Sequence, residues 1–249
     1  MWGVPASAQS SNWISSATTD AWARFGSGAW KTVRIVHKSF DESGALAKQG
    51  AMVTQTEVAR VTRRSFSLQV TTTTELLGQW LPSDPQLIER NFGDPSPLTT
   101  SVGEDAVTIK GRNFPTQVVQ TVTDEADLQR TSTVHLCKLT NPQVLKRVTV
   151  AKDPRNDQVK SHTTVTVTEL DKTVDVLGEL KSCWTVTTVI KVGEKTVTTT
   201  ETHCSDVPGE LVSRTTEEHN ASGQLIRRSE LELVGYGFGE SRRRFRRRR

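Results

Sequence analysis

The stretch TVDVLGELKSCWTVTTVIKVGEKTVTTTETHC, residues 173–204, decides the fold of this chain. Its layout occurs once before, as AVTIKGRNFPTQVVQTVTDEADLQRTSTVHLC over residues 106–137, 67 positions earlier. The matched residues are Val107 with Val174, Gly111 with Gly178, Val119 with Val186, Cys137 with Cys204 and Arg147 with Arg214. A fixed period indicates one supersecondary unit used twice. The sequence therefore predicts an internal duplication, with repeat one at 105–170 and repeat two at 171–237.

Alternation of β-branched or apolar residues with polar ones runs through both copies and through residues 30–76. A period of two is typical of strands that bury one face. The pattern predicts an all-β antiparallel meander of about eleven long strands, three of them in an N-terminal unit at 30–76. Because so wide a sheet does not stay flat, we expect a curved half-barrel or open barrel in a single β domain, residues 21–238.

Residues 77–104 break this alternation. Four of the nine prolines fall in the segment, namely Pro82, Pro85, Pro95 and Pro97. Long ordered loops in compact domains often carry function. The segment therefore predicts an inserted loop or lid, with a plain surface crossover between strands as the alternative.

The basic residues are concentrated at the C-terminus. Seven of the 32 lie in the last eight positions: Arg242, Arg243, Arg244, Arg246, Arg247, Arg248 and Arg249. The remaining 25 stand against 28 acidic residues, so the rest of the chain has a net charge of −3. Like charges repel and nothing in this segment can pack, so residues 239–249 are expected to form a disordered tail. Such a tail can bind nucleic acid or an anionic surface.

The N-terminus predicts export. Residues 1–20 are rich in Ser and Ala and are expected to form a flexible lead. Within it, Ala6-Ser7-Ala8 matches the small-residue end of a secretory signal, although the charged and apolar segments that normally precede such an end are missing. The chain is therefore predicted to be periplasmic or secreted, with a truncated signal peptide; a disordered start is the alternative. No apolar run is long enough to span a membrane as a helix.

The cysteines give the sharpest local prediction. Val192-Gly193-Glu194-Lys195 is typical of a hairpin tip, and a turn centred between Gly193 and Glu194 places Cys183 directly opposite Cys204. At a non-hydrogen-bonded position such a pair suits a disulfide, which would stabilise the fold by roughly 3 kcal/mol through its closed loop. The same register in repeat one places Thr116 opposite Cys137. The alternative is three buried thiols in a reducing compartment.

No catalytic motif is present, and the chain is predicted to be non-enzymatic and free of cofactors. Histidines accompany two of the cysteines, as His135-x-Cys137 and His203-Cys204. Neighbouring residues of a strand point to opposite faces, so His203 and Cys204 would not ligate one ion without a bulge. The spacing fits no familiar zinc pattern, and no metal site is predicted.

Two segments carry a resemblance to a known group. The opening Trp22-Ala23-Arg24-Phe25-Gly26-Ser27-Gly28-Ala29-Trp30, and the later Cys183 with Cys204-Ser205-Asp206-Val207-Pro208-Gly209-Glu210-Leu211-Val212, resemble uncharacterised exported β-rich bacterial proteins. This resemblance covers most of the chain and implies export. More distantly, the strand count resembles the half-barrel of lipoprotein-localisation carriers of the LolA/LolB type, which implies a concave face that holds acyl chains.

The leading functional hypothesis is a periplasmic or secreted protein that holds an apolar ligand or a lipid-modified partner on a concave sheet face. The candidate lining residues are Val33, Ile35, Phe66, Leu68, Val70, Val165 and Val167. The alternative is a structural or protein-interaction module of the cell envelope, in which side chains fill the concavity and a face or edge of the sheet binds another protein. A third hypothesis is binding to nucleic acid or anionic surfaces through the arginine tail. The sequence leaves the oligomeric state open.

Overall fold

The computed structural model describes residues 20–76, 78–92, 99–125 and 127–239. Within these ranges the chain forms one short 3₁₀ helix, η1 (Ala23–Phe25), and fourteen strands. The strands are β1 (Trp30–Phe40), β2 (Leu46–Val61), β3 (Ser65–Leu76), β4 (Gln79–Pro82), β5 (Gln86–Asn91), β6 (Thr99–Ile109), β7 (Arg112–Glu125), β8 (Leu128–Leu136), β9 (Val144–Lys152), β10 (Val159–Val176), β11 (Glu179–Val192), β12 (Lys195–His203), β13 (Leu211–His219) and β14 (Leu225–Gly237). Residues 1–19 of the lead predicted at 1–20, the charged part of the predicted tail and residues 93–98 lie outside the described residues.

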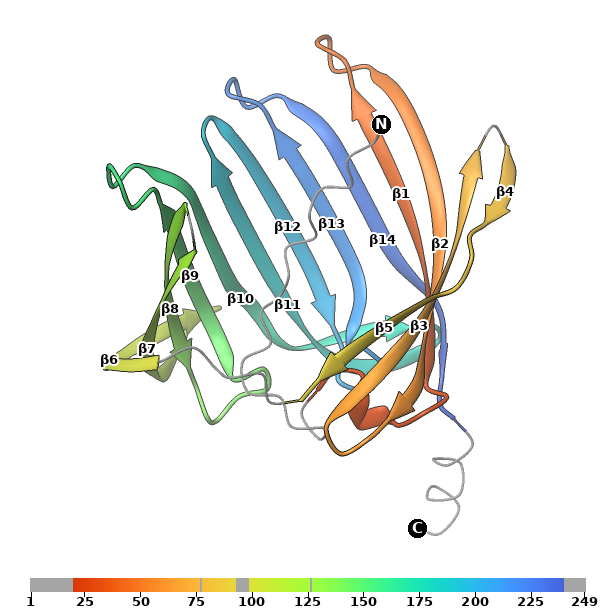
Figure 1. Ribbon diagram of the computed structural model, residues 1–249, viewed down its shortest axis with the longest axis horizontal. Helices are drawn as coiled ribbons and strands as arrows, with labels where there is room; N and C mark the ends of the chain where they lie inside the picture. The colour runs from red at the N-terminus through yellow and green to blue at the C-terminus, as the bar shows by residue number, and fades with distance from the viewer. Residues whose placement is uncertain (1–19, 77, 93–98, 126, 240–249) are drawn as a thin grey trace.

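All fourteen strands belong to one antiparallel sheet, so the predicted all-β meander is confirmed. The order is β4-β3-β2-β1-β14-β13-β12-β11-β10-β9-β8-β7-β6. The strand β5 also pairs with β3, at residues 65–70, whereas β4 pairs with residues 73–76. Apart from β5, each strand pairs with a neighbour in sequence, and β1 also pairs with β14, which brings the N-terminal unit against the end of repeat two. The sheet curves and stays open (Figure 1).

The segment 77–104 corrects the sequence prediction. It contains β4, β5 and the start of β6, and the first two extend the sheet along β3. The strand count accordingly rises from about eleven to fourteen. Only residues 93–98 separate Phe92, after β5, from Thr99, where β6 begins, so these two positions on opposite edges lie within about 25 Å. A sheet this wide must curve strongly to satisfy that limit.

Three separate clusters of buried side chains form the core. The first joins β1, β14 and the β12–β13 connection to the end of the β10–β11 hairpin, through residues such as Val33, Leu231, Cys204 and Val176. The second packs η1 against β2 and β3, with Phe25, Val58 and Phe66 at its centre. The third, in repeat one, surrounds Leu145. The core is therefore divided along the sheet instead of forming one continuous layer.

Equivalent local structures occur in the two repeats at the predicted offset. Lys110 and Gly111 at the β6–β7 turn both have positive φ, as do Leu177 and Gly178 at the β10–β11 turn. Hydrogen bonds recur at the same offset. The N–H of Cys137 donates to the carbonyl of Gln143, and that of Cys204 to the carbonyl of Glu210, at 2.8 Å each. The hydroxyl groups of Ser132 and Thr149 lie 3.0 Å apart, as do those of Thr199 and Thr216. We infer that both units derive from one duplicated motif, in which β10 ends the first unit and begins the second.

The segment before β1 anchors the N-terminal side of the sheet. The buried Asp20 accepts hydrogen bonds through Oδ1 from the backbone N–H groups of Trp22 (2.8 Å) and Ala23 (2.9 Å). The N–H of Gly209 donates to the carbonyl of Ala21 at 2.7 Å, which joins this segment to the β12–β13 connection. Among the described residues, no helix has the length and apolar character to cross a membrane.

Candidate functional site

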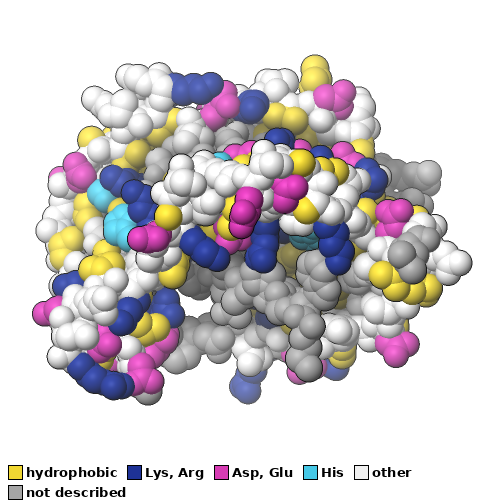
Figure 2. All heavy atoms as spheres, turned by 90° about the horizontal axis from the view of Figure 1, so that it is seen from above, with side chains coloured by type: hydrophobic (Ala, Val, Ile, Leu, Met, Phe, Trp, Pro, Cys, Tyr) yellow, Lys and Arg dark blue, Asp and Glu magenta, His cyan; other side chains and the backbone are white. Residues whose placement is uncertain are grey.

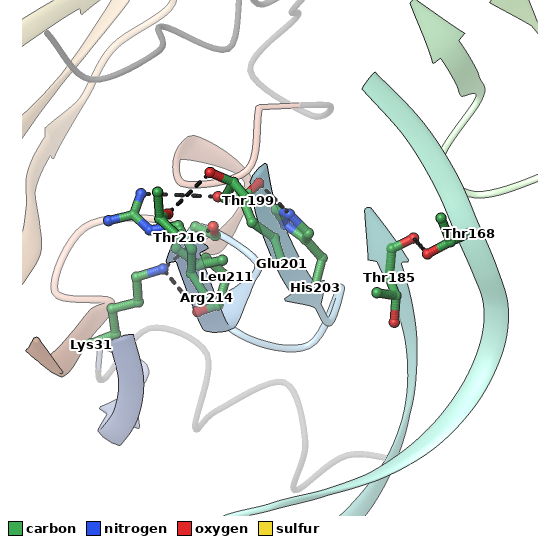
Figure 3. A network of polar contacts seen from close by, with 10 residues as sticks. Lys31, Thr168, Thr185, Thr199, Glu201, His203, Leu211, Arg214 and Thr216 are labelled. Atoms are coloured by element: carbon green, nitrogen blue, oxygen red, sulfur yellow. Dashed lines mark hydrogen bonds and ion pairs between the residues drawn. The ribbon is translucent and has the colours of Figure 1, made fainter. Parts of the chain in front are cut away.

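A buried lysine joins β1 to the β12–β13 connection (Figure 3). Lys31 is only 7% exposed, and its Nζ donates hydrogen bonds to the carbonyls of Leu211 (3.2 Å) and Gly209 (3.4 Å). The ammonium group also lies 5.1 Å from the centroid of the Trp22 ring. Lys31 therefore joins the loop 204–210 to β1, because its Nζ bonds two backbone carbonyls of this region.

A second group of charged residues lies on β12 and β13. Glu201 pairs with Arg214 across the two strands, with Oε1 and Nη1 3.9 Å apart, and its Oε2 lies 3.3 Å from Nε2 of His203. The imidazole of His203 stacks on Trp184 of β11, with ring centroids 5.5 Å apart. Burial tends to raise the pKa of Glu201. The hydrogen bond from His203 and the positive charges of His203, Arg214 and Lys31 outweigh that effect and lower it.

The pKa of Lys31 predicts a pH-dependent stability. Burial lowers this pKa from 10.5 to about 7, against a smaller opposing effect of Glu210. Below pH 7 both the folded and the unfolded chain carry the proton, and the folded state bears the full cost of the buried charge. Between pH 7 and 10.5 the folded chain loses the proton while the unfolded chain keeps it, so this group's contribution to stability rises with pH. The rise should be on the order of 4 kcal/mol.

Urea unfolding at pH 7 and pH 10 measures this contribution, with Lys31→Met as the comparison. The substitution removes the titrating group, so the gain in stability between the two pH values should be smaller in the variant. Equal gains in both proteins would show that Lys31 does not titrate in this range.

The strand registers place all seven predicted lining residues on one face of the sheet, where all but Val165 are divided among three buried clusters. Val33 lies in the first cluster with Ile35 packed against it, Phe66, Leu68 and Val70 contribute to the second, and Val167 belongs to the third. Val165 is half-buried on β10. These apolar side chains largely fill the fold's own core clusters, and their role as the lining of a ligand site stays a prediction.

Two surface depressions of the described residues have mostly polar linings. One, of about 340 Å³, is lined by Arg34, Val36, Arg214, Thr215, Glu230, Leu231 and Glu232. A second, of about 320 Å³, is lined by Arg24, Phe25, Glu179, Lys181, Ser205, Asp206, Tyr236 and Phe238. Hydrophobic side chains are scattered among charged and other polar ones on the face seen in Figure 2. Neither depression has the predominantly apolar lining that a hydrocarbon-binding pocket requires.

Exposed apolar side chains gather instead at the edge formed by β3, β4 and β5. Five large ones are exposed there: Leu76, Trp80, Leu81, Leu87 and Ile88. Among the described strands β5 pairs with β3 alone, and every residue of β4 and β5 is exposed. Unpaired strand edges with apolar side chains readily pair with another chain. Sequence reasoning missed this edge because its prolines indicated a loop.

The predicted register of the cysteine hairpin is confirmed. β11 and β12 pair Val192 with Lys195 and continue to Trp184 opposite His203, which places Cys183 opposite Cys204 at the next position. The two cysteines approach to 3.9 Å, and they are free thiols in this structure, as is Cys137. The disulfide itself stays a prediction.

The comparisons with known proteins concern the fold alone. No family model and no curated protein matches the chain. A Bacteroides fragilis protein described as exported, with a YmcC-like fold, is 10% identical, with a TM-score of 0.30 over 86% of this chain and 99% of its own. A Parabacteroides distasonis protein described as a lipoprotein is 12% identical, with a TM-score of 0.34 over 86% and 98%.

A third similar structure, a DUF1329 family protein from Desulfovibrio piger, is 8% identical, with a TM-score of 0.35 over 86% of this chain and 87% of its own. The first two proteins are described as an exported protein and a lipoprotein, which agrees with the resemblance of the sequence to exported β-rich bacterial proteins. Such low identities and TM-scores give no information about a ligand, a partner or an activity.

Proposed function

We propose that this chain is an exported, non-enzymatic binding module that takes an extended segment of another protein along the β5 edge. The observation that carries the proposal is the unpaired edge itself, with exposed Leu87 and Ile88 on β5 and Trp80 on the adjoining β4. Addition of a strand to such an edge gains backbone hydrogen bonds, and alternate side chains provide specificity. The proposal adopts the protein-interaction hypothesis over the apolar-ligand hypothesis.

The backbone geometry of β5 fits this role. The N–H of Phe92 donates to the carbonyl of Arg64 at 2.7 Å, so Phe92 directs its backbone groups toward the β3 side. Backbone groups in antiparallel strands alternate in direction, so Ile88 and Arg90 also point to β3. Leu87, Glu89 and Asn91 then direct their N–H and C=O groups outward. A partner strand would meet a row of donors and acceptors there that no other described strand uses.

The side chains of β5 define what the partner must offer. Ile88 stands opposite Leu68 and Gln86 opposite Val70, on the sheet face that carries the second core cluster. Leu87 and Glu89 lie on the other face, since successive side chains of a strand alternate. A partner segment with apolar residues at alternate positions would therefore cover Ile88 on one face or Leu87 on the other.

A photo-crosslinking residue at position 87 tests the proposal in the native host. Position 192 is the matched control, because Val192 is exposed to a similar degree on a paired hairpin tip away from the edge. We expect one discrete crosslinked protein from position 87 and none from position 192. Adding Glu89→Pro should strongly reduce this product, because proline removes an outward N–H and leaves the β3 ladder intact. Equal products from both positions, or no effect of Glu89→Pro, would refute the proposal.

The apolar-ligand hypothesis makes a different prediction. Native mass spectrometry of gently purified protein would then show additional mass the size of a hydrocarbon chain. The proposal predicts the mass of the polypeptide alone, because the candidate lining residues occupy three separate clusters. A bound lipid at one molecule per chain would favour the ligand hypothesis.

The arginine tail lies outside the described residues, and its binding to nucleic acid or anionic surfaces stays a separate prediction.

A further inference from the structure

The backbone around Cys204 determines what kind of pair the two opposed cysteines form. The N–H of Cys204 donates to the carbonyl of Glu210 at 2.8 Å, on the side of β13. Since the N–H and C=O of one strand residue point the same way, the backbone of Cys204 does not bond to β11. Cys183 and Cys204 are therefore a non-hydrogen-bonded pair, in which the Cα atoms come closest. This separation falls within the range of natural disulfides.

Access to the pair is closed in the folded protein. Cys183 is 1% exposed and Cys204 is fully buried, and both pack with Val176, Val207 and Val212 in the first core cluster. Burial, with a smaller effect of the neighbouring Cys204, raises the pKa of Cys183 to about 12. The thiolate is the reactive species in disulfide exchange, so a thiol that is buried and protonated does not react with an external oxidant.

We propose that Cys183 and Cys204 acquire a disulfide while the chain folds, before the end of the β10–β11 hairpin packs over the sheet, and that the folded reduced protein does not form it. The oxidant is an oxidised dithiol protein or a small disulfide. The thiolate of Cys183 attacks that disulfide and releases one thiol, and the thiolate of Cys204 then attacks the mixed disulfide and releases the second. Two electrons pass to the oxidant, which becomes two thiols.

Repeat one supplies an internal comparison. The β7–β8 register places Thr116 opposite Cys137, and the N–H of Cys137 donates to the carbonyl of Gln143 at 2.8 Å. Thr116 and Cys137 are thus a pair of the same geometry with one sulfur missing. The variant Thr116→Cys should gain a second disulfide under the same conditions, whereas wild-type Cys137 stays a free thiol.

The experiment counts thiols by alkylation and intact mass on the full chain made in two ways. Protein directed to a bacterial periplasm should have one free thiol, and protein made in a reducing cytoplasm should have three. Oxidised glutathione added to the folded cytoplasmic protein should leave all three, while the same protein treated in denaturant becomes oxidised. Thr116→Cys from the periplasm should have none.

Three thiols in the periplasmic protein would overturn the disulfide. Formation of the Cys183–Cys204 bond in the folded protein, at the rate seen in denaturant, would overturn the order of events. Peptide mapping identifies which cysteines pair, and a bond to Cys137 in wild-type protein would contradict the geometry. The test does not depend on the β5 edge, so it is independent of the proposed function.

Discussion

Replacing Gly209 with alanine is expected to destabilise the protein by about 3 kcal/mol. Gly209 has φ +69, a left-handed conformation that costs a residue with a side chain about 1–2 kcal/mol. A Cβ at this position would lie 2.4 Å from Cε2 of Trp22, and the indole ring would have to move. That movement disturbs the cation–π contact between Lys31 and Trp22 and the hydrogen bond between Gly209 and Ala21.

Gly223→Ala is the matched control for this substitution. Gly223 has φ +81, but a Cβ there has no atom within 4 Å. It should therefore cost only the backbone strain, about 1–2 kcal/mol. Urea unfolding at one pH measures both variants. Equal destabilisation by the two substitutions would show that contact with Trp22 contributes nothing.

Leu145→Ala is expected to destabilise the protein by about 2–5 kcal/mol. Leu145 is fully buried at the centre of the third cluster, where it packs with Val107, Ile109, Cys137 and Val167. Truncation removes apolar contacts and leaves a cavity that surrounding strands can fill only in part. The effect should be large because Leu145 is the largest of the fully buried side chains among the described residues.

The exposed Val159 provides the control for this truncation. Val159→Ala on β10 should change stability by less than about 0.5 kcal/mol, because surface substitutions away from special contacts usually do. Thermal or urea unfolding measures both. A change of less than about 1 kcal/mol for Leu145→Ala would mean that the third cluster does not hold repeat one together.

The sequence predicted the parts of the fold that depend on local pattern. Alternation identified the strands, and the turn at Gly193 and Glu194 fixed the register that places Cys183 opposite Cys204. The sequence missed β4 and β5 because Pro82 and Pro85 argue against a central strand, which pairs on both sides, and so indicated a loop. An edge strand needs hydrogen bonds on one side only, so it accommodates prolines.

Burial that depends on distant segments was not predictable. Glu201 and Arg214 alternate with threonines and fit a solvated strand face, yet the fold half-buries them. Lys31 is buried because the loop 204–210 and Trp22 cover it, and only the assembled fold brings these together. The prediction of Val33 and Phe66 as apolar, inward residues was useful, but their division between two clusters follows from how β1, β3 and η1 pack.

The most direct test of the account is amide hydrogen exchange along β5, followed residue by residue by NMR on the isolated protein. A free edge predicts alternation, with slow exchange at the N–H groups of Ile88, Arg90 and Phe92 and fast exchange at those of Leu87, Glu89 and Asn91. Slow exchange at all six would mean that another segment or a second copy already occupies the edge, and it would contradict the proposal that β5 is open to a partner.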